Sequence, residues 1–271
     1  MTHTENYASG EVLRLLFRQR FGEEACIERL PGAGSDRIYF RLKGKDGKNA
    51  VGTLGPDHRE NECFVSLSEI FRSHGIPVPE IYAATSDMGA YLQEDLGRTD
   101  LLSYLKTPER IPLAADALRQ LVRLQTIPSR EWRRKVMSTP FSRRMVLWDL
   151  NYFKYDFLKP AGIPFDEERL EDDFETLSVA ISKIGESLSG FMYRDFQSRN
   201  VMIKEGKPFF IDYQGGRVGP ILYDVVSFLW QVKADFSEEE REALIGVYME
   251  ELAKIRAFDE AEVRRNIAMF V

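Results

Sequence analysis

Three polar side chains in the second half of the chain have the types and spacing that phosphoryl transfer requires. Asp195 lies five residues before Asn200, and Asp212 follows an apolar run at 209–211. Such a transfer needs one carboxylate that accepts the proton of the acceptor hydroxyl. It also needs an amide oxygen and a second carboxylate that hold Mg²⁺ against the phosphates. The strand, Gly206 turn and strand predicted between Asn200 and Asp212 would form a hairpin that fixes the distance from base to metal.

Two regions of different periodicity would position these residues. Before residue 95, apolar and polar residues alternate in short stretches, which is the strand period, around two amphipathic helices, the first capped by Ser9. Strands are predicted over 26–30, 38–42, 49–54, 80–84 and 90–94, with the second helix over 60–73. After Thr99 the helical period dominates. Helices are predicted over 99–105, 112–127, 142–158, 166–188, 221–233, 237–255 and 259–270, with short strands at 190–193, 200–204 and 208–211.

These elements predict an α+β chain of two lobes. Residues 1–95 would form a small antiparallel sheet with helices, and residues 96–271 a larger helical lobe that carries the hairpin. The joint would lie near Asp95 and Gly97. Because two lobes with a joint enclose a cleft, a ligand is expected between them.

Composition excludes several classes of function. The 271 residues include 37 Lys and Arg against 43 Asp and Glu, a net charge of -6, so the chain lacks the basic character of a nucleic-acid binder. Cys26 and Cys63 have neither metal-binding spacing nor enough partners for a disulfide framework. The N-terminus has no apolar signal-peptide core, and no apolar run is long enough to span a membrane. We therefore expect a cytoplasmic protein without a membrane or nucleic-acid partner.

The segment 193–203, followed by Asp212, resembles the catalytic loop and metal-binding Asp of the protein-kinase-like superfamily, in its aminoglycoside/choline phosphotransferase branch. Tyr193 stands where that loop usually has His. The resemblance implies a protein-kinase-like two-lobed fold and the use of ATP and Mg²⁺. It makes Asp195 the catalytic base and Asn200 and Asp212 metal ligands. In the simpler alternative, Asp195 caps a helix and Asp212 closes a hairpin.

The same resemblance places nucleotide binding in the small lobe. The turn at 32–36 would cover the phosphates, because its small residues, among them Gly34, let backbone N–H groups approach and Ser35 adds a hydroxyl. Glu94 and Leu96 would belong to the hinge whose backbone reads the adenine. Arg37 follows the covering turn and is a further candidate for nucleotide binding.

One departure concerns the cation that usually clamps the phosphates. Most kinases carry a Lys on the third strand, paired with a helix Glu, but residues 49–54 contain no Lys. Lys48 or Arg37 could supply the positive charge. Glu60 or Glu62 would then be the helix partner.

A finer resemblance concerns the acceptor. Only residues 213–223 separate Asp212 from Asp224 and the next helix, which leaves no room for a protein kinase's activation segment, so we expect a small-molecule acceptor. Residues 191–229, and more loosely 32–41, 94–97 and 148–153, are similar to bacterial cell-wall amino-sugar 1-kinases. Those enzymes phosphorylate the anomeric hydroxyl of N-acetylmuramate or N-acetylglucosamine. A choline or aminoglycoside acceptor, or a catalytically weak nucleotide-binding regulatory module, remains an alternative.

Four further side chains are candidates for binding the acceptor. Asp149 and Asn151 would suit sugar hydroxyls, and Arg199 and Arg217 a carboxylate or the transferring phosphate. We expect Asp224 instead to be structural, accepting bonds from the catalytic-loop backbone. The amphipathic segment 259–271 stops without a polar tail, so an additional C-terminal domain is expected in a longer protein.

Overall fold

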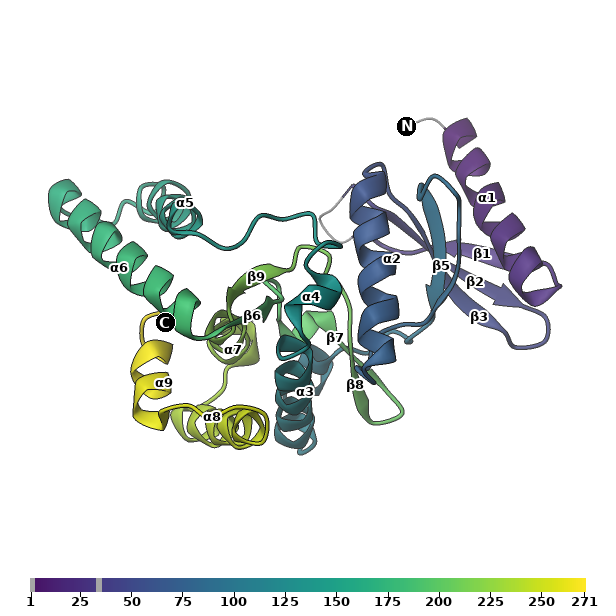
Figure 1. The fold of residues 1–271 in the computed structure, drawn as a ribbon. Helices are drawn as coiled ribbons and strands as arrows, with labels where there is room; N and C mark the ends of the chain where they lie inside the picture. The colour runs from purple at the N-terminus through teal and green to yellow at the C-terminus, as the bar shows by residue number, and fades with distance from the viewer. Residues whose placement is uncertain (1–2, 33–35) are drawn as a thin grey trace.

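The computed structural model describes residues 3–32 and 36–271 (Figure 1). Its N-terminal part is a five-stranded antiparallel sheet in the order β1-β2-β3-β5-β4. The strands are β1 (Ala25–Arg29), β2 (Ile38–Gly44), β3 (Asn49–Leu54), β4 (Ile81–Ala84) and β5 (Ala90–Glu94). Helix α1 (His3–Phe21) covers one face of the sheet and α2 (His58–Ser73) lies along the other.

Side-chain alternation in the central strands explains why the sheet has two covered faces. Ala90 and Leu92 of β5 belong to the apolar cluster that includes Leu13 of α1. Between them, Tyr91 points to the opposite face and stacks on Phe64 of α2, with ring centroids 5.4 Å apart. Because successive strand residues face opposite sides, one strand contributes to both cores.

The C-terminal part is mostly helical and carries two small two-stranded antiparallel sheets. Its helices are α3 (Arg110–Gln125), α4 (Ser129–Trp132), α5 (Arg143–Phe153), α6 (Glu167–Ser187), α7 (Leu222–Leu229), α8 (Glu238–Ala253) and α9 (Glu260–Ile267). Short helical turns are η1 (Leu101–Tyr104), η2 (Lys154–Leu158), η3 (Ser198–Asn200) and η4 (Val232–Ala234). Strand β6 (Ser189–Met192) pairs with β9 (Arg217–Pro220), and β7 (Val201–Lys204) pairs with β8 (Lys207–Phe210).

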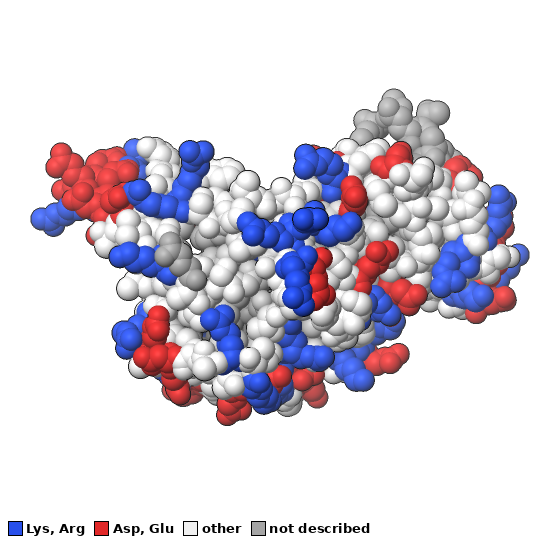
Figure 2. All heavy atoms as spheres, in the orientation of Figure 1, with Lys and Arg blue, Asp and Glu red and all other residues white. Residues whose placement is uncertain are grey.

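Helices α5 and α6 stand apart from the body of the C-terminal part (Figure 1). An acidic group of side chains, which includes Glu167 and Glu168 of the first turn, gathers at the outer end of α6 (Figure 2). The buried Lys154 amine bonds Glu167 at 2.5 Å and Glu171 at 2.6 Å. These ion pairs join α6 to Lys154, the residue that directly follows α5.

The structure confirms the α+β class with an antiparallel N-terminal sheet, but it corrects several expected boundaries. The first helix begins at His3, so Ser9 lies inside the helix and does not cap it. A Ser in a helix interior costs only a fraction of a kcal/mol, roughly 0.5 kcal/mol relative to Ala. The helix expected over 221–233 ends at Leu229. Strand β9 was not expected, because Gly219 and Pro220 are poor strand formers. Within the described ranges, no helix is long and apolar enough to cross a membrane.

Candidate active site

A buried carboxylate holds the catalytic-loop segment in place. Asp224 of α7 accepts hydrogen bonds from the backbone N–H of Tyr193 at 2.8 Å and of Arg194 at 2.9 Å, and from the Gln125 amide at 2.9 Å. Burial raises the pKa of Asp224 to about 7, and these donors oppose the rise. Arg194 has a φ of 82°, a left-handed conformation that a non-glycine residue rarely adopts. The predicted structural role of Asp224 is therefore confirmed.

The structure brings the three residues with predicted chemistry to one place. The amide nitrogen of Asn200 donates to the Asp195 carbonyl at 2.8 Å and lies 3.5 Å from Oδ2 of Asp212. Oδ1 of Asp212 accepts a bond from the Gln214 amide at 2.8 Å, and Asp212 itself has a φ of 69°. The β7–β8 hairpin lies between Asn200 and Asp212 in the sequence. Because its two strands are antiparallel, the chain reverses direction there and brings the two side chains together.

The Asp195 carboxyl lies in a mixed electrostatic environment. Burial is the largest effect that raises its pKa above the ordinary value, and the negative charge of Asp212 raises it further. The positive charges of Arg194, Arg199 and Arg217 oppose this rise. A raised pKa makes the carboxylate a better proton acceptor than an exposed Asp.

The donor set at Asn200 and Asp212 fits Mg²⁺. Both side chains offer oxygen, which is the ligand that this hard cation prefers. The amide oxygen of Asn200 has no hydrogen-bond partner within the described residues, because its nitrogen makes the bonds named above. No group of three His, Cys, Asp or Glu side chains there could hold a metal unaided. A magnesium ion bound here would therefore take its further ligands from phosphate oxygens and water.

A cavity of about 280 Å³ opens above these residues, between the sheet and the hairpin. Val51, Phe64 and Tyr91 give it apolar walls, the hinge residues 93–97 form one side, and Asn200 and Asp212 form its base. In the described part of the chain, neither the N–H nor the C=O of Leu96 has a hydrogen-bond partner. Apolar walls beside an unused backbone donor and acceptor suit a purine ring.

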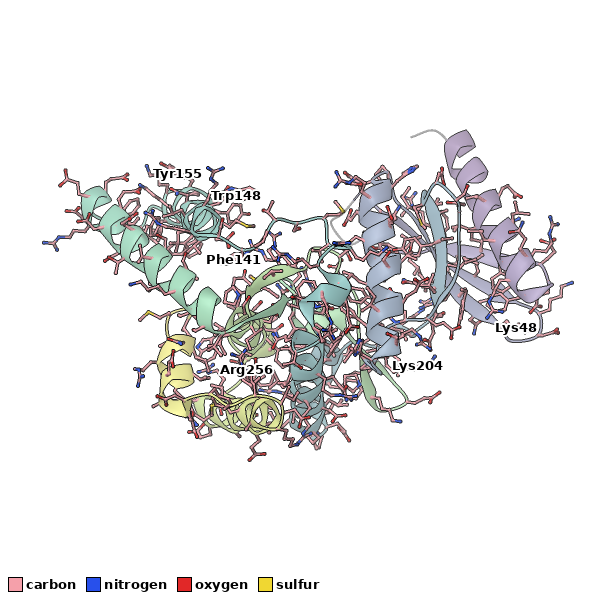
Figure 3. All side chains as sticks on the ribbon, in the orientation of Figure 1. Lys48, Phe141, Trp148, Tyr155, Lys204 and Arg256 are labelled. Atoms are coloured by element: carbon pink, nitrogen blue, oxygen red, sulfur yellow. The ribbon has the colours of Figure 1, made fainter. Side chains whose placement is uncertain are left out.

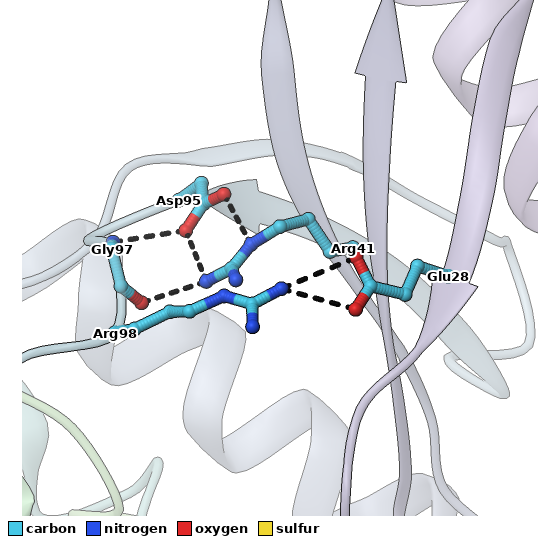
Figure 4. Close-up of polar contacts among 5 residues, drawn as sticks. All are labelled: Glu28, Arg41, Asp95, Gly97 and Arg98. Atoms are coloured by element: carbon cyan, nitrogen blue, oxygen red, sulfur yellow. Dashed lines mark hydrogen bonds and ion pairs between the residues drawn. The ribbon is translucent and has the colours of Figure 1, made fainter.

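Ion pairs fix the hinge beside this cavity (Figure 4). Arg41 binds both carboxylate oxygens of Asp95, at 2.7 and 3.0 Å, and the Gly97 carbonyl at 2.7 Å. Both partners of the pair are largely buried, with 6% and 12% of their side chains exposed. On the other side, Lys204 of β7 (Figure 3) binds Glu94 at 2.6 Å. The hinge is thus tied to both the sheet and the catalytic hairpin.

The structure distinguishes between the two candidates for the phosphate-binding cation. Arg37 lines the cavity with a buried side chain, and its guanidinium lies 3.0 Å from a Glu60 carboxylate oxygen. Lys48 lies at the outer end of the sheet (Figure 3), with its amine 5.9 Å from the Phe21 ring centroid. Glu62 is exposed. The pair that meets at the cavity is therefore Arg37 with Glu60.

The remaining predicted residues have varied surroundings. Gly34 and Ser35 lie outside the described residues. Asp149 forms a two-fold ion pair with Arg194, with both distances 2.7 Å. The Asn151 amide donates to the Leu147 carbonyl of its own helix at 2.8 Å.

The two candidate arginines differ in their surroundings. Arg217 contacts the Met145 sulfur at 3.0 Å, and burial together with the nearby Arg194 lowers its pKa. Arg199 is exposed beside the catalytic loop.

Several residues of the site were not predicted. Tyr193 donates its hydroxyl proton to the Ile211 carbonyl, which braces the two ends of the catalytic segment. Gln214 binds Asp212, and its carbonyl accepts the Cys63 thiol at 3.4 Å. The available signal was the position of Gln214, two residues after Asp212 in the sequence. Burial raises the pKa of Cys63 to about 11, so its thiol stays protonated.

Comparison with known proteins defines the class. The model of the phosphotransferase enzyme family, APH, matches residues 27–260, and the chain belongs to this family. It is therefore a small-molecule kinase of the APH family, whose kinases use ATP with Mg²⁺.

The more particular likenesses are distant. An N-acetylmuramate/N-acetylglucosamine kinase of Neisseria meningitidis is 27% identical over 83% of this chain and 68% of its own. An enzyme of the same name from Pseudomonas aeruginosa is 25% identical over 86% of this chain and 69% of its own. Among solved structures, a macrolide 2′-phosphotransferase of Brachybacterium faecium has a TM-score of 0.67 at 14% identity, covering 96% of this chain and 88% of that one. A choline kinase of Cryptosporidium parvum has a TM-score of 0.65 at 12% identity, covering 96% and 85%.

Proposed function

We propose that the chain transfers the γ-phosphoryl group of ATP to the anomeric hydroxyl of an N-acetylated amino sugar, as a kinase of cell-wall recycling. The observation that supports the kinase chemistry is that Asn200 contacts both Asp195 and Asp212, and that Asn200 and Asp212 line the base of the nucleotide cavity. The names of the curated relatives support the sugar acceptor, since they are N-acetylmuramate/N-acetylglucosamine kinases.

The proposed roles follow from position. The sheet part, residues 1–95, binds the nucleotide, with adenine at the Leu96 backbone and phosphates near Arg37. Residues 96–271 carry the catalytic loop and the acceptor site. Mg²⁺, held by Asn200 and Asp212, would neutralise phosphate charge when bound.

In the proposed reaction, Asp195 orients the acceptor hydroxyl and takes its proton. The acceptor oxygen forms a bond to the γ-phosphorus, and the bond from that phosphorus to the β,γ-bridging oxygen breaks. The products are a sugar 1-phosphate, ADP and a proton. An anomeric hydroxyl is more acidic than an ordinary alcohol, so a carboxylate with a raised pKa is an adequate base.

Product analysis tests the proposal. The protein is incubated with ATP, Mg²⁺ and either N-acetylmuramate or N-acetylglucosamine, and phosphorus NMR locates the new phosphate. We expect a sugar 1-phosphate, and no product from the methyl glycoside, whose anomeric oxygen is blocked. Phosphate on the 6-hydroxyl, or turnover of the methyl glycoside, contradicts the proposal.

A parallel screen tests the alternative acceptors. Choline and aminoglycosides replace the sugars under the same conditions, and ADP release is measured. Turnover of either in place of the sugars would assign a different acceptor to the same kinase. ATP binding with no turnover of any acceptor would favour the regulatory module.

A further inference from the structure

A second cavity, of about 480 Å³, opens beside the catalytic loop. Its walls include Gln197 and Arg199 of the loop, Tyr223 and Trp230 at the two ends of α7, and Lys233 just beyond. It shares none of its lining residues with the nucleotide cavity. Its volume lies within the range of small-molecule sites, about 300–1,000 Å³, which accommodates one substituted sugar ring.

This cavity lies next to the proposed base. Gln197 and Arg199, which line the cavity, lie two and four residues after Asp195 in the catalytic loop. The positive charge of Arg199 opposes the rise that burial and the charge of Asp212 cause in the pKa of Asp195. Arg199 and Asn200 are consecutive, but Arg199 lines this cavity whereas Asn200 lines the nucleotide cavity. The catalytic loop thus lies between the two cavities: the nucleotide cavity is on the side of Asn200, and the second cavity is on the side of Arg199.

Among the side chains that line the cavity, the two charged ones, Arg199 and Lys233, are both positive. Phe270 and Val271, the last two residues of the sequence, also line it. Neither cation forms a hydrogen bond or an ion pair with any described residue. The acidic side chains of this part of the chain lie elsewhere, at the outer end of α6 (Figure 2) and in the first turns of α8 and α9.

The aromatic walls are poorly suited to a cationic acceptor. Two of the three rings, those of Tyr223 and Trp230 but not that of Phe270, already have a guanidinium over them: Arg194 lies 5.2 Å from the Tyr223 centroid, and Arg241 lies 5.2 Å from that of Trp230. A quaternary ammonium or a polyamine would therefore add positive charge to rings that already hold it. It would also face Arg199 and Lys233 with no carboxylate from the lining side chains to offset the repulsion.

We propose that this cavity binds the acceptor and that Arg199 and Lys233 select an amino sugar that carries a carboxylate over a neutral one. The inference rests on the proposed function and deepens it. Of the two sugars in the relatives' names, N-acetylmuramate carries a lactyl carboxylate and N-acetylglucosamine does not. Arginine and lysine both make charge-assisted hydrogen bonds to a carboxylate, and these are stronger than bonds between neutral groups.

Acceptor kinetics test the inference. kcat/KM is measured for N-acetylmuramate, for its methyl ester, which is similar in shape but uncharged, and for N-acetylglucosamine. We expect N-acetylmuramate to be favoured about tenfold or more over the other two, the effect of one to two charge-assisted hydrogen bonds. Arg199→Gln and Lys233→Gln should each lower kcat/KM for N-acetylmuramate about tenfold more than they lower kcat/KM for N-acetylglucosamine.

Matched controls and the neutral sugar keep the test interpretable. Arg134→Gln and Lys183→Gln change exposed residues elsewhere and should leave all three values unchanged. Retained turnover of N-acetylglucosamine shows that each cavity variant is folded. Equal kcat/KM for the three acceptors, or equal losses on all three in the variants, overturns this inference and leaves the proposed function intact. No turnover of either sugar by the unaltered chain overturns the proposed function and this inference with it.

Discussion

The nucleotide cavity and the acceptor cavity hold their charged side chains in different ways. Around the nucleotide cavity the cations are paired: Arg41 with Asp95, and Lys204 with Glu94. In the acceptor cavity, Arg199 and Lys233 have no such partner among the described residues. Paired charges keep the backbone in position before a ligand arrives, whereas cations without partners attract an anionic ligand. The nucleotide cavity is therefore organised to hold its backbone in position, and the acceptor cavity to select an anionic ligand.

The largest expected effect lies at the boundary of the two cavities. Asp195→Asn should lower kcat by about 10²–10⁴-fold, because it removes the general base. Affinity for Mg-ATP, measured by calorimetry, should be nearly unchanged because nucleotide binding uses other groups. The matched control is Asp116→Asn, on the exposed face of α3. A variant that retains near-full turnover would exclude Asp195 as the base.

Two arginines near the hinge test whether buried pairing positions the nucleotide cavity. Arg41→Gln leaves Asp95 buried without its partner and should lower the free energy of unfolding by about 3 kcal/mol. Arg98→Gln breaks an ion pair with Glu28 whose side chains are 65% and 54% exposed. The loss of this exposed pair should cost less than about 1 kcal/mol. Denaturant titration measures both. Equal losses of unfolding free energy in the two variants would mean that burial does not make the Arg41–Asp95 pair more important to stability than the exposed Arg98–Glu28 pair.

The metal-binding role of Asp212 is tested by removing its charge without straining the backbone. Asp212 has a left-handed φ of 69°, and Asp212→Asn is preferred to Ala because Asn tolerates that conformation. We expect Mg-ATP affinity to fall about 10- to 100-fold, the scale of losing a group that supports a metal. Asp235→Asn, at another left-handed Asp with φ 47°, is the matched control. Unchanged affinity in calorimetry would remove Asp212 from the metal site.

The smallest expected effect is on pH dependence. Only the ionised Asp195 can accept a proton, so kcat/KM should fall as pH drops through its pKa, which lies above the ordinary Asp value of about 3.9. Arg199→Gln removes a positive charge that favours the carboxylate. The acid limb should therefore move to higher pH, by a fraction of a unit. An acid limb that stays in place or moves to lower pH in the pH–rate profile would mean that the charge of Arg199 does not favour the Asp195 carboxylate.

The catalytic set could be predicted because its spacing is local. Asp195, Asn200 and Asp212 lie on one loop and one hairpin, so their types and separations are visible in sequence order. The role of Asp224 was likewise predictable, because a carboxylate that opens an apolar helix must be buried and satisfied.

Contacts between distant segments could not be predicted in the same way. The choice of Arg37 over Lys48 depends on which end of the sheet faces the hairpin, and this follows from strand pairing. The ion pair between Asp149 and Arg194, 45 residues apart in sequence, is another such contact, and the prediction that Asp149 binds a sugar stays a prediction. Lys233 was placed inside a helix; the helix ends before it, and this leaves its side chain in the acceptor cavity.

The two cysteines make the protein suitable for labelling without prior mutation. Cys26 is exposed on β1, whereas Cys63 is buried with a pKa of about 11. Thiol reagents act on the thiolate, so a maleimide dye at neutral pH should attach at Cys26 alone. A dye there would sit on the edge strand of the sheet. Paired with a second probe on the helical part, it would report by energy transfer how far the sheet moves when nucleotide and acceptor bind.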